Sequence, residues 1–82
     1  MSPRNPWAFA RANGISVCVT SEAIELTTDG TAERVTVRWS PDTDRTHSLI
    51  WTGLARCLLQ RQQGLYTDTQ AAALAAELRG AS

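Results

Sequence analysis

Apolar and polar residues alternate along three stretches of the first half of the chain, residues 15–19, 22–28 and 32–39. A period of two residues is typical of a β-strand that buries one face and exposes the other. The three stretches therefore predict three antiparallel strands in a meander. The residues expected on the buried face are Ile15, Val17, Val19, Ile24, Leu26, Val35, Val37 and Trp39.

The connections between these stretches predict how the strands pair. Asp29-Gly30 is typical of a two-residue hairpin loop, and such a loop places Ile24 opposite Val35. A second two-residue turn at Thr20-Ser21 places Val17 opposite Ile24. Because Thr-Ser is a poor former of such turns, a looser connection is the alternative, and it leaves the same residues on the buried face.

A helical pattern follows over residues 41–63. Ser40 is suited to cap its first turn, and Pro41 suits the first helical position. Leu49 and Leu59 lie outside the apolar stripe and hint at a second contact. The stripe expected in the core contains His47, Ile50, Trp51, Leu54, Cys57, Leu58 and Leu65. The opposite, solvent-facing side is expected to contain Thr52, Gly53, Arg56, Gln60 and Gln63.

Residues 7–12 have two interpretations. Asn5-Pro6 is typical of a helix start and Asn13-Gly14 of a helix stop, which together predict one or two helical turns. The alternative is a strand that turns back through Asn13-Gly14, because Asn-Gly is also a strong hairpin signal. The helix is favoured because the three alanines of this stretch are poor strand formers.

A second helix is predicted over residues 68–79. Gly64 ends the long helix, and residues 67–70 have the pattern of a capping box, with Tyr66 placed to pack on Ala71. We therefore expect one small α+β domain over residues 1–82, with two layers and loose ends at 1–4 and 80–82. The small and apolar residues Ala71, Leu74, Ala75 and Leu78 form a smooth seam on the second helix.

Composition excludes several classes of protein. Eight arginines balance eight acidic residues, so the formal net charge is zero and strong non-specific DNA binding is disfavoured. No apolar run is long enough to span a bilayer, and residues 1–6 lack the apolar segment that a secretion signal would have. Cys18 and Cys57 have no metal-site or redox spacing, which favours a reduced, cytoplasmic setting.

Catalytic equipment is sparse in this sequence. His47 is the single histidine, and it is interpreted as a structural residue. Cys57 lies nearly three helical turns from His47, too far for a nucleophile and its base, whereas a pairing of His47 with Cys18 is left open. No phosphate loop, paired carboxylates or metal constellation is present. We therefore expect no enzyme activity, no cofactor and no metal.

A partner-binding surface is predicted on the face of the sheet opposite the core. That face carries small and polar residues with two arginines at its edge, and Glu25 is expected to pair with Arg34 across the strands. An ordinary solvent-exposed sheet face is the alternative. The residues expected to contact a partner are Glu25, Arg34, Thr36 and Arg38 on the strands and Arg56 on the long helix.

Residues 34–38, followed by Ser40-Pro41, resemble the strand and helix start of ribbon-helix-helix repressors, which place strand residues in the DNA major groove. This resemblance covers about nine residues and implies a DNA-binding dimer that uses Arg34, Thr36 and Arg38. The rest departs from the family, because the following helical pattern is long and two strands precede the ribbon.

These observations favour a non-enzymatic protein-binding module, acting as a monomer or homodimer, that docks on a larger protein or nucleoprotein complex. Its size and single compact domain suit an inhibitor from a phage or mobile element, of the anti-CRISPR type. The alternatives are the ribbon-helix-helix-like DNA binder and a self-associating structural or accessory subunit that uses the sheet face or the helix seam.

Overall fold

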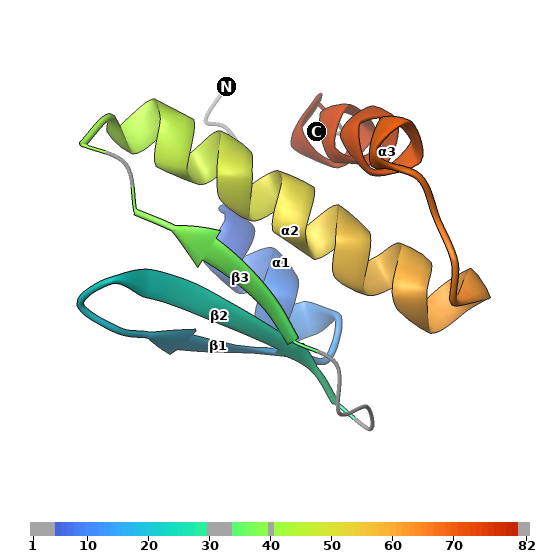
Figure 1. Cartoon of the computed structure of the whole chain (residues 1–82), viewed down its shortest axis with the longest axis horizontal. Coiled ribbons are helices and arrows are strands. Elements are labelled where there is room, and N and C mark those ends of the chain that lie inside the picture. Colours follow the sequence, from blue (N-terminus) through green and yellow to red (C-terminus); the bar gives the residue numbers. More distant parts are fainter. Residues whose placement is uncertain (1–4, 30–33, 40, 81–82) are drawn as a thin grey trace.

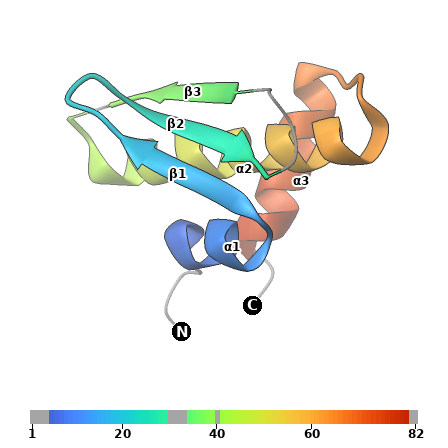
Figure 2. The ribbon, with the colours of Figure 1, turned by 90° about the horizontal axis from the view of Figure 1, so that it is seen from below.

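The computed structural model describes residues 5–29, 34–39 and 41–80. It contains one antiparallel sheet with strand order β1-β2-β3, and the three helices lie on one side of it (Figures 1 and 2). The predicted α+β architecture is confirmed. In chain order the elements are α1 (Pro6–Ala12), β1 (Ile15–Val19), β2 (Ala23–Thr28), β3 (Arg34–Arg38), α2 (Thr43–Gln63) and α3 (Asp68–Gly80).

Helix α1 begins and ends where its capping residues predict. The Asn5 side chain accepts hydrogen bonds from the backbone amides of Trp7 and Ala8, and Pro6 occupies the first turn. The helix stops at Asn13, and Gly14 has a φ of 70°, which glycine adopts without steric cost. The helical interpretation of residues 7–12 is therefore confirmed, and the strand alternative is excluded.

The strands pair in a register that differs by two residues from the predicted one. Ile24 lies opposite Val37 and not opposite Val35. Val17 lies opposite Leu26 and not opposite Ile24. Because side chains alternate with a period of two, a shift of two residues keeps each side chain on its predicted face. The pairing predictions are wrong, whereas the faces are those expected.

Side-chain hydrogen bonds account for both shifts. The Thr20 hydroxyl accepts from the amides of Glu22 and Ala23, so the first turn is centred one residue later than predicted. Asp29 is drawn toward β1, because its amide donates to the Gly14 carbonyl over 2.8 Å and its carboxylate accepts from Ser16 over 2.9 Å. Asp29 therefore takes part in the pairing of β1 with β2. Gly30, the other residue of the predicted two-residue loop, lies outside the described residues.

Helix α2 begins at Thr43, two residues later than predicted. Asp42 is the capping residue, and its carboxylate accepts from the amides of Asp44 and Arg45. A carboxylate is favoured at this position by the partial positive charge of the helix end. The predicted cap, Ser40, lies outside the described residues.

Helix α2 lies between the sheet and α3 and is therefore buried on two sides (Figure 1). Ile50 and Leu54 are fully buried in the core. Gly53, predicted on the solvent side, instead faces the sheet, because a Cβ at this position would lie 2.7 Å from Leu26 Cδ1. The hint of a second contact is confirmed for Leu59, which is 8% exposed, but not for Leu49, which is 38% exposed.

Helix α3 starts with the predicted capping box. The Thr67 hydroxyl accepts from the Gln70 amide, and the Gln70 side chain accepts from the Thr67 amide. Ala71 and Ala75 are buried, and Leu74 and Leu78 pack against the core. The predicted seam is used inside the chain, where it lets α3 approach α2.

Four apolar or aromatic positions predicted in the core are exposed. Val19 and Trp39, at one end of the sheet, are 58% and 43% exposed, although the Trp39 indole donates to the Thr20 carbonyl over 2.8 Å. His47 is exposed in the first turns of α2, and Leu65, beyond the end of that helix, is 89% exposed. The helices therefore cover only part of the inner sheet face.

Candidate functional site

Strand β3 is an edge strand, and it carries three of the five predicted contact residues. Arg34, Thr36 and Arg38 are exposed on the outer face, opposite the helices. Along the middle strand β2, the backbone hydrogen-bonding groups of successive residues point alternately to β1 and to β3. In this register the backbone N–H and C=O groups of Arg34, Thr36 and Arg38 point away from the sheet. Side chains and free backbone groups of one strand thus reach the same edge.

The predicted pair of Glu25 and Arg34 forms, but with different geometry. Glu25 lies opposite Thr36, and Arg34 lies opposite Thr27. The guanidinium Nη1 of Arg34 nevertheless reaches Glu25 Oε1 diagonally, over 3.3 Å. Because the Arg34 side chain is 61% exposed, solvent screens this ion pair, and its contribution to stability is small.

Arg56 of α2 joins the edge from the helical layer. It lines a hollow of about 200 Å³ together with Thr36 and Arg38 of β3, and the apolar side chain of Leu49 lies in the same wall. On the outer face, Thr36 and Arg38 also border a second hollow of about 440 Å³ beside Glu22. We call the residues Arg34, Thr36, Arg38 and Arg56 the arginine edge.

The Arg56 guanidinium is only partly used within the chain. Its Nη2 lies 3.3 Å from Asp68 Oδ1, a carboxylate at the start of α3 that is 92% exposed. Its Nε is buried and has no hydrogen-bond partner in the described part of the chain. A planar guanidinium binds a carboxylate best through two parallel hydrogen bonds, so Arg56 retains donor capacity beside the hollow.

The structure therefore brings together Thr36, Arg38 and Arg56, and it places Arg34 and Glu25 beside them on the outer face. The sequence pattern located the strand residues by their alternation. The same analysis placed Arg56 on the solvent-facing side of α2. In the structure this side of the helix borders β3, and nothing in the sequence indicated the hollow between the two elements.

A third hollow, of about 470 Å³, is lined by residues of all three helices and was not predicted. Trp7 and Trp51 form apolar walls, and Asp44, His47 and Arg79 supply charged or polar groups around it. Such a combination is the usual make-up of a pocket for a small ligand or a partner side chain. Because its residues come from all three helices, only the tertiary structure assembles it.

The thiols and the histidine are kept apart. Cys18 is exposed on the outer face of the sheet, whereas His47 belongs to α2 on the inner side, so the structure does not form the pairing that the sequence left open. Cys57 is buried, and burial raises the pKa of its thiol. Residues 5–29, 34–39 and 41–80 contain no group of three or more side chains that could hold a metal ion.

In the described part of the chain, no helix is both long enough and apolar enough to cross a membrane. Comparison with protein-family models, with curated proteins and with solved structures finds no match to this chain.

Proposed function

We propose that the protein is a non-enzymatic binding module that docks on a larger protein or nucleoprotein complex through the arginine edge. The gathering of Thr36, Arg38 and Arg56 around one hollow carries this proposal. We further propose that it is an inhibitor of the anti-CRISPR type, from a phage or mobile element, that acts by occupying a surface of this partner. The small single domain and the sparse catalytic equipment support that class.

The chemistry of the edge suits a protein partner. Arginine is enriched at binding hot spots, because its guanidinium combines charge, planar hydrogen bonding and apolar contact. Leu49, 38% exposed, adds an apolar contact within the same hollow. An acidic side chain of the partner, entering between Arg38 and Arg56, would meet donors from both a strand and a helix.

Electrostatic focusing would be local at this site. The formal net charge of the chain is zero, so no long-range positive field attracts polyanions. Binding would instead depend on the clustered arginines and on shape. This distinguishes the proposal from the DNA-binding alternative, in which phosphate contacts supply most of the affinity.

The DNA-binding alternative rests on one specific observation, the row of Arg34, Thr36 and Arg38 along a single strand face. Two features weaken it. Helix α2 continues without a break through Thr52 and Gly53, whereas ribbon-helix-helix proteins have a short first helix. Strand β3 is also already paired with β2 within the chain. In the self-associating alternative, the α3 seam is not available for a second copy, because it packs on α2 within the chain. The outer face of the sheet is still available.

The test is a charge reversal at the edge. The tagged protein is used as bait in lysate of its host, and the captured complex is compared with that of the variant Arg34→Glu, Arg38→Glu. We expect an unchanged fold by circular dichroism and loss of the captured partner. The single variants Arg38→Glu and Arg61→Glu form a matched pair, because both reverse one exposed arginine and Arg61 donates to the Asn13 carbonyl beside β1, at the opposite edge of the sheet.

Loss of the partner with Arg38→Glu but not with Arg61→Glu assigns binding to the arginine edge. Equal capture by the wild type and by the double variant would show that another surface binds the partner. Equal loss with both single variants would show a general effect of net charge.

A further inference from the structure

The other edge of the sheet, formed by β1, is also unpaired within residues 5–29, 34–39 and 41–80. The Thr20 amide donates to the Ala23 carbonyl, and the Asp29 amide donates to the Gly14 carbonyl, so even-numbered residues of this strand face β2. By the alternation of an antiparallel ladder, the backbone N–H and C=O groups of Ile15, Val17 and Val19 point away from the sheet. This free edge offers the hydrogen-bonding groups that an added strand would use.

The two edges of the sheet differ in charge. Along β3, Arg34 and Arg38 are exposed, and charged side chains are a common device that discourages edge-to-edge pairing. Along β1, residues 15–19 carry no charge, and Val19 is 58% exposed. The β1 edge therefore lacks the protection that β3 has.

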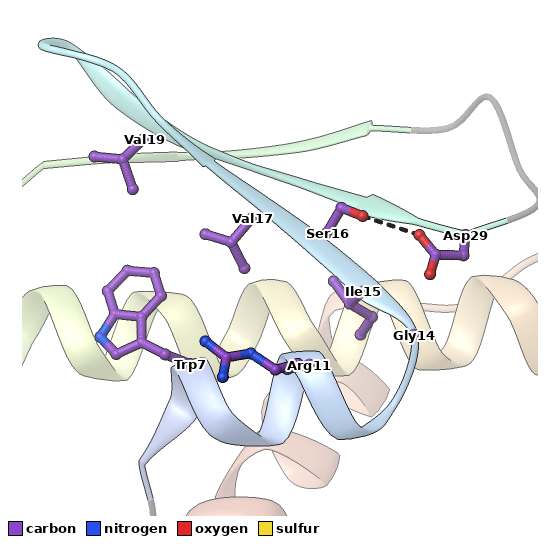
Figure 3. Close-up of a pocket in the computed structure, with 8 residues that line it drawn as sticks. All are labelled: Trp7, Arg11, Gly14, Ile15, Ser16, Val17, Val19 and Asp29. Carbon is purple, nitrogen blue, oxygen red and sulfur yellow. Dashed lines mark hydrogen bonds between the residues drawn. The ribbon is translucent and has the colours of Figure 1, made fainter.

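A groove of about 540 Å³ runs beside β1, between this strand and α1. Figure 3 shows the side chains of Val17 and Val19 directed from the strand toward the groove, with the Trp7 indole below them on α1. Trp7 and Val17 are half-buried. The groove thus joins an unpaired backbone edge to a partly exposed apolar wall.

Two charged side chains of opposite sign, Arg11 and Asp29, line this groove. Arg11 of α1 is exposed and lies beside the groove, and among the described residues it makes no ion pair. Asp29, at the far end, accepts from the Ser16 hydroxyl over 2.9 Å (Figure 3). An acidic side chain in an added strand would complement Arg11.

We propose that the β1 edge binds an extended segment of another protein, which adds as a fourth strand. The segment would pair with the outward backbone groups of Ile15, Val17 and Val19, place alternate apolar side chains in the groove, and direct one carboxylate to Arg11. A second copy of this chain that paired through β1 fits less well, because residues 15–19 carry no carboxylate to place beside Arg11. This site is independent of the arginine edge.

A displayed library of random peptides of about nine residues, the length of a long strand, serves as the probe. We expect enrichment of peptides with alternating apolar residues and an Asp or Glu. The synthetic form of an enriched peptide is then added during hydrogen exchange followed by NMR. The amides of Ile15, Val17 and Val19 should exchange quickly in the free protein and become protected when the peptide binds, whereas those of Ser16 and Cys18 are protected in both.

Two substitutions locate the contact. Val17→Pro removes an amide that does not pair with β2, and proline is tolerated on edge strands, so the variant should fold and lose peptide binding. Val17→Thr keeps the amide and is the matched control. Arg11→Glu should weaken binding of the acidic peptide at least tenfold and strengthen binding of the same peptide with lysine in place of the acidic residue.

Three outcomes would overturn the proposal. The first is the absence of enriched peptides. The second is equal binding by the folded Val17→Pro variant, or by Val19→Lys if the proline variant does not fold. The third is protection of the Ile15, Val17 and Val19 amides in the free protein that rises with protein concentration, which would identify a second copy as the occupant.

Discussion

Gly53 of α2 faces Leu26 of β2 so closely that a Cβ on the glycine would lie 2.7 Å from Leu26 Cδ1 and 3.0 Å from Val37 Cγ2. Leu26 is fully buried, and Val37 is 6% exposed. A side chain at residue 53 would therefore push against the centre of the core. The glycine sets how near the helix approaches the sheet.

Gly53→Ala should destabilise the fold despite the higher helix propensity of alanine. The propensity gain is about 1 kcal/mol, whereas overpacking a close-packed core costs about 1–3 kcal/mol. We expect a net loss of about 1 kcal/mol in the free energy of unfolding, measured by urea denaturation. Gly80→Ala is the control, because no atom would lie within 4 Å of the new methyl group, and it should change stability by less than about 0.5 kcal/mol. A more stable Gly53→Ala variant would contradict this account.

Thr67→Ala should weaken the start of α3. The hydroxyl accepts from the Gln70 amide over 3.1 Å, and loss of such a cap costs about 1 kcal/mol. Thr69→Ala, in the first turn of the same helix, is a matched control without a capping role. It should change stability by less than about 0.5 kcal/mol. Thermal unfolding followed by circular dichroism compares the two, and equal melting temperatures would rule out a stabilising cap.

The two cysteines should differ in reactivity. Cys18 is exposed, whereas Cys57 is 1% exposed. Burial raises the pKa of the Cys57 thiol above its ordinary value of 9.0, and the opposing effects of the Thr28 hydrogen bond and the Arg61 charge are smaller. Iodoacetamide at neutral pH should alkylate Cys18 in the folded protein and Cys57 only in denaturant, as read by mass spectrometry. Rapid alkylation of both thiols in the folded protein would contradict the burial of Cys57.

The same thiol should link stability to high pH. Well below pH 9.0 it is protonated in both the folded and the unfolded chain. Above that value the unfolded chain loses the proton first, so the free energy of unfolding should fall as pH rises toward the raised pKa of the folded state. Urea denaturation between about pH 8 and pH 10 should show a steeper decline for the wild type than for Cys57→Ala. Parallel declines would assign the pH dependence to other groups.

Duplex DNA should bind weakly at physiological ionic strength. With a formal net charge of zero, the chain has only the local arginine edge to offer to phosphates. We expect fluorescence anisotropy to show little binding, and a similar result for Arg34→Glu with Arg38→Glu. Tight binding by the wild type that falls steeply with salt and disappears in the double variant would favour the DNA-binding alternative instead.

Alternation and capping made most of the fold predictable. Asn5-Pro6 and Thr67 through Gln70 act through local hydrogen bonds, so their positions in the sequence located two helix starts correctly. The strand register was less accessible. The register depends on hydrogen bonds of the Thr20 hydroxyl and on whether Asp29 pairs with Gly14 or forms the predicted turn. Neither interaction produces a periodic pattern in the sequence.

The candidate site was predictable in part. Arg34, Thr36 and Arg38 follow from alternation, because a strand with one buried face must expose the other. The contribution of Arg56 to a shared hollow depends on how α2 crosses β3. Gly53 explains why this was missed, since a residue without a side chain gives no hydropathy signal even where it lets the helix pack closely on the sheet.

The unequal edges of the sheet limit how far any strand-mediated assembly can grow. A strand that adds to β1 leaves β3 at the opposite end, where Arg34 and Arg38 oppose a further addition. Association through the sheet would therefore stop after one step and yield a complex of fixed composition. A domain with one strand edge open to pairing can in this way form a discrete complex and not a growing fibre.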